Sequence, residues 1–158
     1  MNYWILMFRP ETYEKVKEHE TIGVTGLHQK RIAAVQPGDR FVTYVSRTRV
    51  VDGHGRFTSE AFVDMAPMFG VREVYPCRAK VAFEQTGARI DAKELLWGLA
   101  EFATCDAKTT PSNMLLCRGG LMKITAEDFE WLRKVLDGTW VPPEAAPSVN
   151  PATPATSL

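Results

Sequence analysis

The residues with the clearest chemical potential form a short basic segment, His28, Lys30 and Arg31, which precedes a turn at Pro37–Gly38. From His28 to Arg56 the chain has six Lys or Arg residues and two Asp residues, although the net charge of the whole chain is +0. Lysine and arginine side chains neutralise phosphates. The segment is therefore a candidate for contact with a phosphate backbone. A solvated surface is the alternative interpretation.

Aromatic residues near this segment could add a second kind of contact. Stacking of a base on an aromatic ring contributes about 1–3 kcal/mol. Packing in the core is the alternative for each ring, above all for Trp4, which stands beside Ile5 and Leu6. The candidate rings are Trp4, Phe8, Tyr44, Phe69, Tyr75 and Trp97.

Motifs of the common catalytic classes do not occur in the chain. There is no phosphate-binding loop, dinucleotide fingerprint, zinc-protease helix or nucleophile elbow. Three cysteines without a close pair fit reduced, buried thiols rather than disulfides or zinc ligands. The three histidines lack the spacing of a metal site. We therefore expect no cofactor and no metal, and no catalytic residues are nominated, although a pair of distant carboxylates is invisible in one sequence.

The bulk properties place the chain among single-domain globular proteins. Its 158 residues are enough for one hydrophobic core, and 45% of them are apolar. The apolar run at the N-terminus stops at Arg9, which does not match a secretory signal. No stretch approaches the roughly 20 apolar residues that cross a bilayer. We therefore expect a cytoplasmic protein that does not contact membranes.

The periodicity of apolar residues predicts the elements that position the candidate residues. Residues 3–8 are apolar on both faces and predict a strand that is buried on both sides. Pro10 favours a helix start, and Asp91 with Glu94 resembles a capping box. The pattern predicts helices over 10–19, 27–35, 94–104 and 128–136, strands over 40–45, 56–63, 77–84 and 112–117, and a turn at 52–55.

Short strands between scattered short helices, without regular alternation, predict an α+β fold, with a small mixed barrel as the natural candidate. Beyond Gly138 the composition changes: residues 141–158 contain five prolines and one charged residue, Glu144. Such a segment buries too little to offset its ordering entropy. We expect one domain over residues 1–139 and a disordered tail rich in proline and alanine over residues 140–158.

The chain resembles a known protein family in five stretches, which follow one another in the order that the family shows. They are NYWILMFRPETYEKVKEH, GVTGLHQKRIAAVQPGDRFVTYV, TSEAFVD, VYPCRAKV and SNMLLCRGGLMKITAEDFEWLRKVL. With them the chain resembles the EVE domain family, small members of the PUA-like superfamily related to YTH domains. The resemblance implies a PUA-like mixed β-barrel of about five to six strands with short flanking helices. It also implies a pocket at the basic rim for a modified base of DNA or RNA.

The resemblance also assigns residues to that pocket by their positions. A base pocket is implied for Arg9, Gly23, Val24, Thr25, Asn113 and Met114, with Trp4 and Tyr44 as candidate aromatic walls, and phosphate contacts for His28, Lys30 and Arg31. Gly23, Val24 and Asn113 would bond base edges, and Met114 would pack on the base. YTH readers carry an aromatic residue where this chain has Thr25, so modified cytosine and modified adenine both stay open.

Three functions compete on these grounds. The first is a non-catalytic module that reads a modified base, with nucleic acid as its partner and no set oligomeric state. The second is a small hydrolase of a modified nucleoside or amide, as in the ASCH group, for which Lys80, Glu84 and Thr43 supply suitable residue types. The third is a protein-interaction module whose pocket is vestigial.

Overall fold

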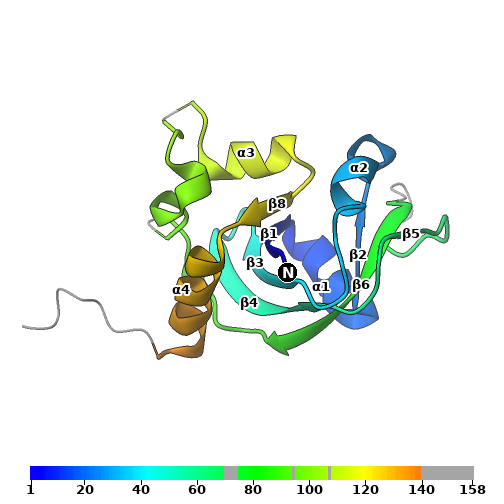
Figure 1. The fold of residues 1–158 in the computed structure, drawn as a ribbon, viewed down its shortest axis with the longest axis horizontal. Coiled ribbons are helices and arrows are strands. Elements are labelled where there is room, and N and C mark those ends of the chain that lie inside the picture. Colours follow the sequence, from blue (N-terminus) through cyan, green and yellow to red (C-terminus); the bar gives the residue numbers. More distant parts are fainter. Residues whose placement is uncertain (70–74, 94, 107, 140–158) are drawn as a thin grey trace, which may run out of the picture.

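One curled, mixed β-sheet forms the centre of the fold (Figure 1). The computed structural model describes residues 1–69, 75–93, 95–106 and 108–139. Six strands lie in the order β2-β6-β4-β3-β1-β8, while β5 pairs with β6 and β7 with β4. The strands are β1 (Tyr3–Phe8), β2 (Thr21–Val24), β3 (Arg40–Val45), β4 (Val50–Phe57), β5 (Phe62–Val63), β6 (Cys77–Gln85), β7 (Ile90–Asp91) and β8 (Leu121–Ile124).

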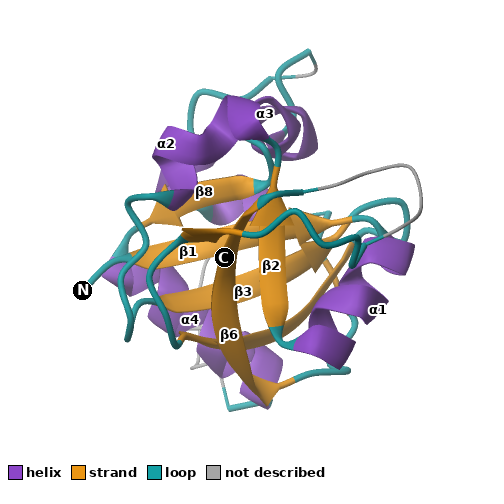
Figure 2. Cartoon of the chain, turned by 90° about the vertical axis from the view of Figure 1, so that its right-hand side faces the viewer, coloured by secondary structure: helices purple, strands orange, loops and turns teal. Residues whose placement is uncertain are grey.

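Short helices flank the sheet on its outer face and at its ends (Figure 2). They are α1 (Pro10–His19), η1 (Gly26–His28), α2 (Gln29–Ile32), η2 (Leu96–Gly98), η3 (Ala100–Phe102), α3 (Pro111–Cys117) and α4 (Ala126–Asp137), where η marks a 3-10 helix. The α+β class, and the mixed barrel with short flanking helices, are therefore confirmed. The barrel is incomplete, because the described strands form an open sheet.

Alternation along the strands builds two hydrophobic cores. On β1, Trp4, Leu6 and Phe8 enter the cluster inside the curl of the sheet. Their neighbour Ile5 enters a second cluster, together with residues of η2, η3, α3 and α4 on the outer face of the sheet. Successive side chains of a strand point to opposite faces. The expected burial of residues 3–8 on both sides is thus confirmed.

Two of the predicted elements are wrong. Residues 112–117 form helix α3 rather than a strand, because Thr110 Oγ1 accepts a hydrogen bond from Asn113 N (3.3 Å) and Pro111 occupies the first turn. Such an N-cap and an early proline favour a helix start. The helix predicted over 94–104 is two 3-10 turns, separated by the extended backbone of Leu99. Glu94 lies outside the described residues.

Three further predictions need correction. Residues 52–55 lie within β4 rather than in a hairpin turn, and the strand is irregular there, since its pairing shifts register between Thr43 and Tyr44 and between His54 and Gly55. Gly53 and Gly55 let the backbone of β6 approach closely: a Cβ there would stand 2.2 Å from the carbonyl oxygens of Gln85 and Ala82. The helix predicted over 27–35 is shorter, and Leu27 is 87% exposed rather than inward. The strand predicted over 56–63 is interrupted, because β4 ends at Phe57 and β5 covers only Phe62–Val63.

Buried Asp39 joins the start of β1 to the turn before β3. Its carboxylate accepts hydrogen bonds from Asn2 N (2.9 Å), Trp4 Nε1 (3.1 Å) and Gln36 N (3.1 Å). Gly38 adopts a positive φ of 93°, which a glycine tolerates. A buried carboxylate is stable only when its oxygens are bonded. Asp39 therefore holds Trp4 in the core and sets the parallel pairing of β1 with β3.

A second buried group fastens helix α1 to the sheet. Tyr13 Oη donates to Asp52 Oδ2 at 2.8 Å and lies 3.1 Å from Thr43 Oγ1. Gly87 N also donates to Asp52 Oδ2, at 3.1 Å. Burial raises the pKa of the Tyr13 phenol, and the Asp52 carboxylate raises it further, so the hydroxyl keeps its proton and donates.

The open seam of the sheet lies between its end strands, β2 and β8. Pairing of β1 with β8 ends at Leu6 and Leu121, after which Met7 N donates to Gly120 O (2.8 Å). Across the seam the His28 side chain packs on Gly119, so close that a Cβ there would lie 2.5 Å from the imidazole. We call this contact the His28–Gly119 bridge. It joins the η1 side of the molecule to the turn between α3 and β8.

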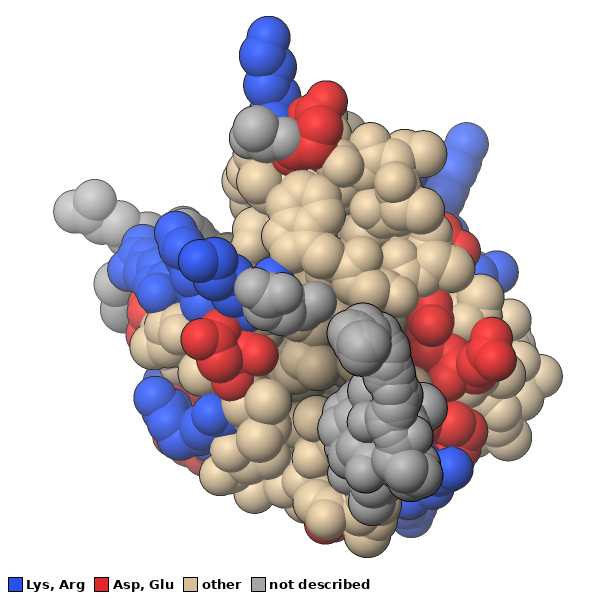
Figure 3. Space-filling model, turned by 90° about the vertical axis from the view of Figure 1, so that its left-hand side faces the viewer, with Lys and Arg blue, Asp and Glu red and all other residues tan. Residues whose placement is uncertain are grey.

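The outer face with α4 carries both signs of charge (Figure 3). Lysine and arginine side chains lie near aspartate and glutamate side chains around a largely uncharged centre, which fits the net charge of +0. Among the described residues, no helix combines the length and apolar character needed to cross a bilayer. The predicted tail over residues 140–158 lies outside the described part of the chain.

Replacing Tyr13 by phenylalanine tests the anchor of α1. Because Asp52 loses a donor while it stays buried, we expect the free energy of unfolding to fall by about 1–3 kcal/mol in urea titrations. Tyr3→Phe is the matched control, since the Tyr3 ring packs on Phe129 and no described residue bonds its hydroxyl. It should change stability by less than about 0.5 kcal/mol. Equal effects of the two substitutions would contradict this role of the Tyr13 hydroxyl.

Replacing Gly119 by alanine tests the His28–Gly119 bridge. Gly119 has a φ of 69°, and the new Cβ would collide with the His28 ring. We expect a loss of about 1–2 kcal/mol from the left-handed backbone alone, with more from displacement of the ring, measured by urea unfolding. Gly26→Ala is the control, because nothing lies within 4 Å of a Cβ at that position. A stable Gly119→Ala protein would show that the bridge does not hold the seam.

Candidate functional site

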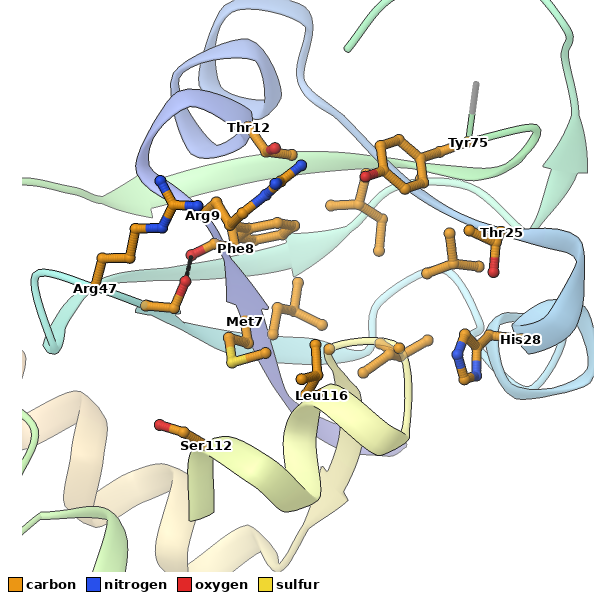
Figure 4. Close-up of a pocket in the computed structure, with 18 of the residues that line it drawn as sticks. Met7, Phe8, Arg9, Thr12, Thr25, His28, Arg47, Tyr75, Ser112 and Leu116 are labelled. Atoms are coloured by element: carbon orange, nitrogen blue, oxygen red, sulfur yellow. Dashed lines mark hydrogen bonds between the residues drawn. The ribbon is translucent and has the colours of Figure 1, made fainter. Parts of the chain in front are cut away.

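A cavity of about 530 Å³ opens at the seam of the sheet (Figure 4). Its size falls within the range of small-molecule sites. The residues come from β1, α1, β2, η1, α3 and β8, from the residues that join these elements, and from the segments that follow β3 and precede β6. They are Leu6, Met7, Phe8, Arg9, Thr12, Ile22, Gly23, Val24, Thr25, His28, Ser46, Arg47, Tyr75, Ser112, Asn113, Leu116, Gly119, Gly120 and Leu121.

The interior of the cavity is apolar because it reaches the inner core of the sheet. Leu6, Phe8, Ile22, Val24 and Leu121 line it and also belong to the cluster inside the curl. The sheet does not close over this end of the cluster, so the cavity opens onto it. In a closed barrel, other strands would cover these apolar side chains. Here a flat, apolar group of a ligand could cover them instead.

The backbone of Gly23 presents hydrogen-bonding groups to the cavity. Val81 N donates to Glu20 O (3.0 Å), so these two residues form a hydrogen-bonded pair of the antiparallel β2–β6 ladder. Such pairs alternate along a ladder with pairs that are not bonded. Ile22 and Val24 therefore direct N–H and C=O toward β6. Gly23 directs its own toward the opposite edge, where the cavity lies.

Tyr75 forms a wall of the cavity beside Gly23. The Tyr75 and Phe69 rings meet edge to face at 5.6 Å. A Cβ on Gly23 would lie 2.8 Å from atoms of both residues, so only glycine lets this wall rest on β2. The residues between Phe69 and Tyr75 are not described.

Buried Arg78 positions the wall. Its Nε donates to Tyr75 O at 2.9 Å, and its Nη2 donates to Ala66 O. Its Nη1 lies 3.5 Å from Asp64 Oδ2, and the guanidinium carbon lies 5.6 Å from the Phe69 ring centroid. One side chain on a regular strand thus holds both ends of the segment that carries Tyr75.

Two arginines form the rim at one end of the cavity. Figure 4 shows Arg9 and Arg47 on the same side, near Phe8. Glu11 Oε1 lies 3.7 Å from Arg9 Nε and 3.8 Å from Arg47 Nη1. Exposed ion pairs of this kind contribute little, about 0–1 kcal/mol, so an incoming anion can compete with Glu11 for the guanidinium groups.

His28 and helix α3 form the remaining rim. His28 and Thr25 lie at the end of the cavity away from Arg9, and Leu116 points into the space from α3 (Figure 4). Asn113 lines the same side, and its Nδ2 donates to Lys108 O at 3.3 Å. The Asn113 amide oxygen can still accept a hydrogen bond from a ligand.

The structure brings six of the predicted site residues together in this cavity. They are Arg9, Gly23, Val24, Thr25, His28 and Asn113. The space between Gly23 and Asn113 is open rather than filled by the protein's own side chains. The stretch GVT (residues 23–25), with the neighbouring His28, therefore borders this cavity, which we also call the slot.

Three predicted pocket residues lie elsewhere. Trp4 is 1% exposed, and its indole donates to Asp39, so its faces are held in the core. Tyr44 belongs to the second hydrophobic cluster, on the outer face of the sheet, and its hydroxyl forms a hydrogen bond with Ser112 Oγ at 2.7 Å. Met114 packs against the same core, 3.0 Å from Cys105 Sγ. Because residues 112–117 form a helix, Leu116 rather than Met114 faces the slot.

Lys30 and Arg31 are separated from His28. Both line a second hollow on another side of the molecule and do not line the main cavity. His28 ends η1 and its backbone (φ −106°, ψ 18°) is not helical, whereas Lys30 and Arg31 belong to α2, so the His28 side chain leaves the chain in a different direction. The three predicted phosphate contacts are therefore divided between two surfaces.

Several lining residues are not predicted by the sequence. Phe8 and Arg47 stand out there only as an aromatic and a basic residue, and no pattern distinguishes Thr12 or Ser46. The adjacent Gly119 and Gly120 are a usable signal, since both have positive φ and allow the sharp turn into β8. Nothing in the local sequence places Ser46 beside β1.

The described lining residues are mainly apolar, hydroxyl and cationic. Among these described residues there is no carboxylate and no lysine. Ser46 Oγ donates to Phe8 O (3.3 Å), and Ser112 Oγ is bonded to Tyr44 Oη. Lys80, Glu84 and Thr43 do not line the cavity. Within the described residues, no three His, Cys, Asp or Glu side chains gather as metal ligands do.

Comparisons with solved structures agree with this fold. The crystal structure of the Mmi1 YTH domain has a TM-score of 0.64 and 14% identity, over 87% of this chain and 96% of that chain. The YTH domain of the Zygosaccharomyces rouxii MRB1 protein, solved in complex with N6-methyladenosine RNA, has a TM-score of 0.65 and 12% identity, over 94% and 88%. At such identities the likeness establishes the shared fold.

Comparisons of sequence identify the family. The UPF0310 protein PH1033 of Pyrococcus horikoshii is 33% identical over 94 residues, which are 51% of this chain. The match spans 65% of that relative's length, less than two thirds. The family model for the EVE domain matches residues 2–135. By this match, which takes in all the strands and the cavity between them, the chain belongs to the EVE domain family.

Proposed function

We propose that the chain binds one modified base of a nucleic acid in the cavity at the seam and performs no chemistry on it. The observation that carries the proposal is the composition of this cavity. An apolar slot, the outward backbone edge of Gly23 and a rim with Arg9 and Arg47 stand together, with no carboxylate among the described lining residues. A heterocycle linked to a phosphate matches these three features at once.

Each part of the cavity has a role in this proposal. The Tyr75 and Phe8 rings and the aliphatic residues pack against the base. Gly23 N–H and C=O, Thr25 and the Asn113 amide bond the edges of the base. Arg9 and Arg47 contact a phosphate at one end of the slot, and His28 contacts another at the far end. Trp4, Tyr44 and Met114 do not line the cavity, so the proposal gives them no contact with the base.

The solved neighbours support nucleic acid as the partner. The MRB1 domain of the same fold was solved with RNA that carries N6-methyladenosine. A Mmi1 YTH domain was also solved in a complex with RNA. A base enters such a slot only after leaving its stack, which costs a few kcal/mol in a duplex. We therefore infer that single strands are preferred over duplexes.

Hydrolysis of a modified nucleoside has less support. General acid–base catalysis requires a group such as a carboxylate, lysine or histidine within hydrogen-bond reach of the reacting atoms. Among the described lining residues, His28 is the one such group, and its ring packs on Gly119. The Glu84 carboxylate is held by Arg40 and Arg56 on the outer part of the sheet.

Binding of matched nine-nucleotide oligonucleotides tests the proposed function. We would titrate RNA and DNA that carry one central N6-methyladenine or 5-methylcytosine, and their unmodified counterparts, by fluorescence anisotropy. Burial of one methyl group contributes about 0.8 kcal/mol, so one modified strand should bind roughly fourfold more tightly or better. Equal affinity for every modified and unmodified pair would contradict the proposal.

Filling the slot tests its location. Leu116 is 67% exposed and points into the cavity, so Leu116→Trp should occupy the space and leave the fold intact. Loss of stacking of one base should weaken binding of the preferred strand about tenfold or more and remove the preference for modification. Leu27→Trp is the control, because Leu27 is 87% exposed and does not line the cavity.

Asn113→Ala gives a finer test of base-edge contact. The side chain is exposed, so its loss should not change stability by more than about 0.5 kcal/mol. If the amide bonds the base, the ratio of modified to unmodified affinity should change while the slope of log affinity against log salt stays the same. An unchanged ratio in anisotropy titrations would remove Asn113 from the proposed base contacts.

A further inference from the structure

A second hollow lies beyond the His28–Gly119 bridge, between α2, η3 and β8. Its volume is about 440 Å³. It is lined by Trp4, Lys30, Arg31, Ala34, Glu101, Arg118, Met122 and Lys123, and we call it the cationic hollow. The main cavity shares none of these residues.

The charges of the cationic hollow are unbalanced. Lys30, Arg31, Arg118 and Lys123 stand against one carboxylate, Glu101. Within the described part of the chain, none of the four is in an ion pair, whereas Arg9, Arg40, Arg47, Arg56, Arg78 and Arg133 all are. Like charges that gather around a concave surface raise the local potential and attract anions. A chain with a net charge of +0 thus has a locally positive surface at the cationic hollow.

The apolar floor holds the cations at the edge of the hollow. Trp4 and Met122 form the apolar floor of the hollow. Both are buried, so neither presents a hydrogen-bonding group to a ligand. Lys123 Nζ lies 5.6 Å from the Trp4 ring centroid, and Arg118 Nη1 lies 3.4 Å from Met122 Sδ. Long cationic side chains commonly cover apolar surface while their charged ends reach solvent. Here the elements that carry them are rigid strands and helices of the seam.

The two concave surfaces are neighbours along the same elements. On β1, Leu6 lines the main cavity and Trp4 the cationic hollow, about 7 Å apart along a strand. Gly119 lines the first and Arg118 the second, on either side of one peptide bond. A chain of nucleotides that leaves the slot past His28 therefore reaches the cationic hollow within a short distance.

We propose that the cationic hollow binds backbone phosphates of nucleotides adjacent to the one in the slot. The ligand is then a single-stranded oligonucleotide rather than a free nucleoside. This inference rests on the proposed function of the main cavity. Four cations spread over α2, β8 and the end of α3 suit a series of phosphates better than one small anion. The apolar floor adds no donor that would select a particular ion.

Paired substitutions test this role through the dependence of binding on salt. The double variants Lys30→Ala/Arg31→Ala and Arg118→Ala/Lys123→Ala would each be titrated with the preferred nine-nucleotide oligonucleotide (the nonamer). They would also be titrated with the mononucleotide of its central base. Removing one cation that neutralises a phosphate of a single strand makes the negative slope of log affinity against log salt shallower by about 0.7. We expect each pair to make the slope shallower by about 1.4 and to weaken nonamer binding about 25-fold at 0.1 M salt. Mononucleotide binding should stay the same.

Two further variants check sign and specificity. Glu101→Gln removes the one carboxylate of the hollow and should strengthen nonamer binding. Lys15→Ala/Lys134→Ala removes the same charge from exposed positions that line neither concave surface, and should leave the slope unchanged. Circular dichroism would confirm that every variant is folded. An equal loss in this control pair would reduce the effect to net charge and overturn the inference.

The outcomes separate the two proposals. If modified and unmodified strands bind equally while the hollow variants lose affinity, the proposed function fails and phosphate binding by the hollow stands. If the preference for a modified base remains and both hollow pairs bind the nonamer like the wild type, the inference about the hollow fails alone. Competition by polyglutamate as strong as that by an oligonucleotide would also overturn it, in favour of an acidic protein partner.

Discussion

The incomplete closure of the β-sheet is the constraint on which the rest of the molecule depends. Strands β2 and β8 each have only four residues, and they end the described sheet without pairing with one another. Edge strands with free backbone groups are normally shortened or covered, because they invite pairing with other chains. Here the His28–Gly119 bridge spans the gap at one point, and the rest stays open. The cavity is therefore the part of the inner core that the sheet leaves uncovered.

An open core needs a rigid frame, and buried polar groups supply it. Asp39 accepts three hydrogen bonds that fix β1 beside the turn before β3, and Asp52 accepts the Tyr13 hydroxyl that fixes α1. Arg78 does the same for the wall that carries Tyr75. Bonded groups of this kind hold geometry because leaving any of them unpaired is costly. Sites on strands held in this way need little rearrangement to receive a ligand.

Much of the fold could be predicted from local sequence, because strands such as β1, β3 and β6 and helices α1 and α4 carry clear periodicity. The failures have identifiable causes. A six-residue apolar run does not distinguish a strand from a helix, and the Thr110 cap and Pro111 decided α3. The glycines around His54 resemble a turn but serve close packing of β4 on β6. In the site, the family resemblance predicts GVT, whereas Ser46 and Arg47 meet β1 only through tertiary pairing.

The separation of His28 from Lys30 and Arg31 changes what the basic segment can do. As one cluster they would hold a single phosphate, and the protein would suit a mononucleotide. Divided by the His28–Gly119 bridge, they face two concave surfaces that lie within about 7 Å of each other along β1. Among the described residues, the four cations of the hollow are in no ion pair, whereas Arg9 and Arg47 at the rim of the main cavity both lie near Glu11. A chain without net charge can therefore bind a polyanion, because the positions of its cationic side chains, rather than its total charge, determine where phosphates bind.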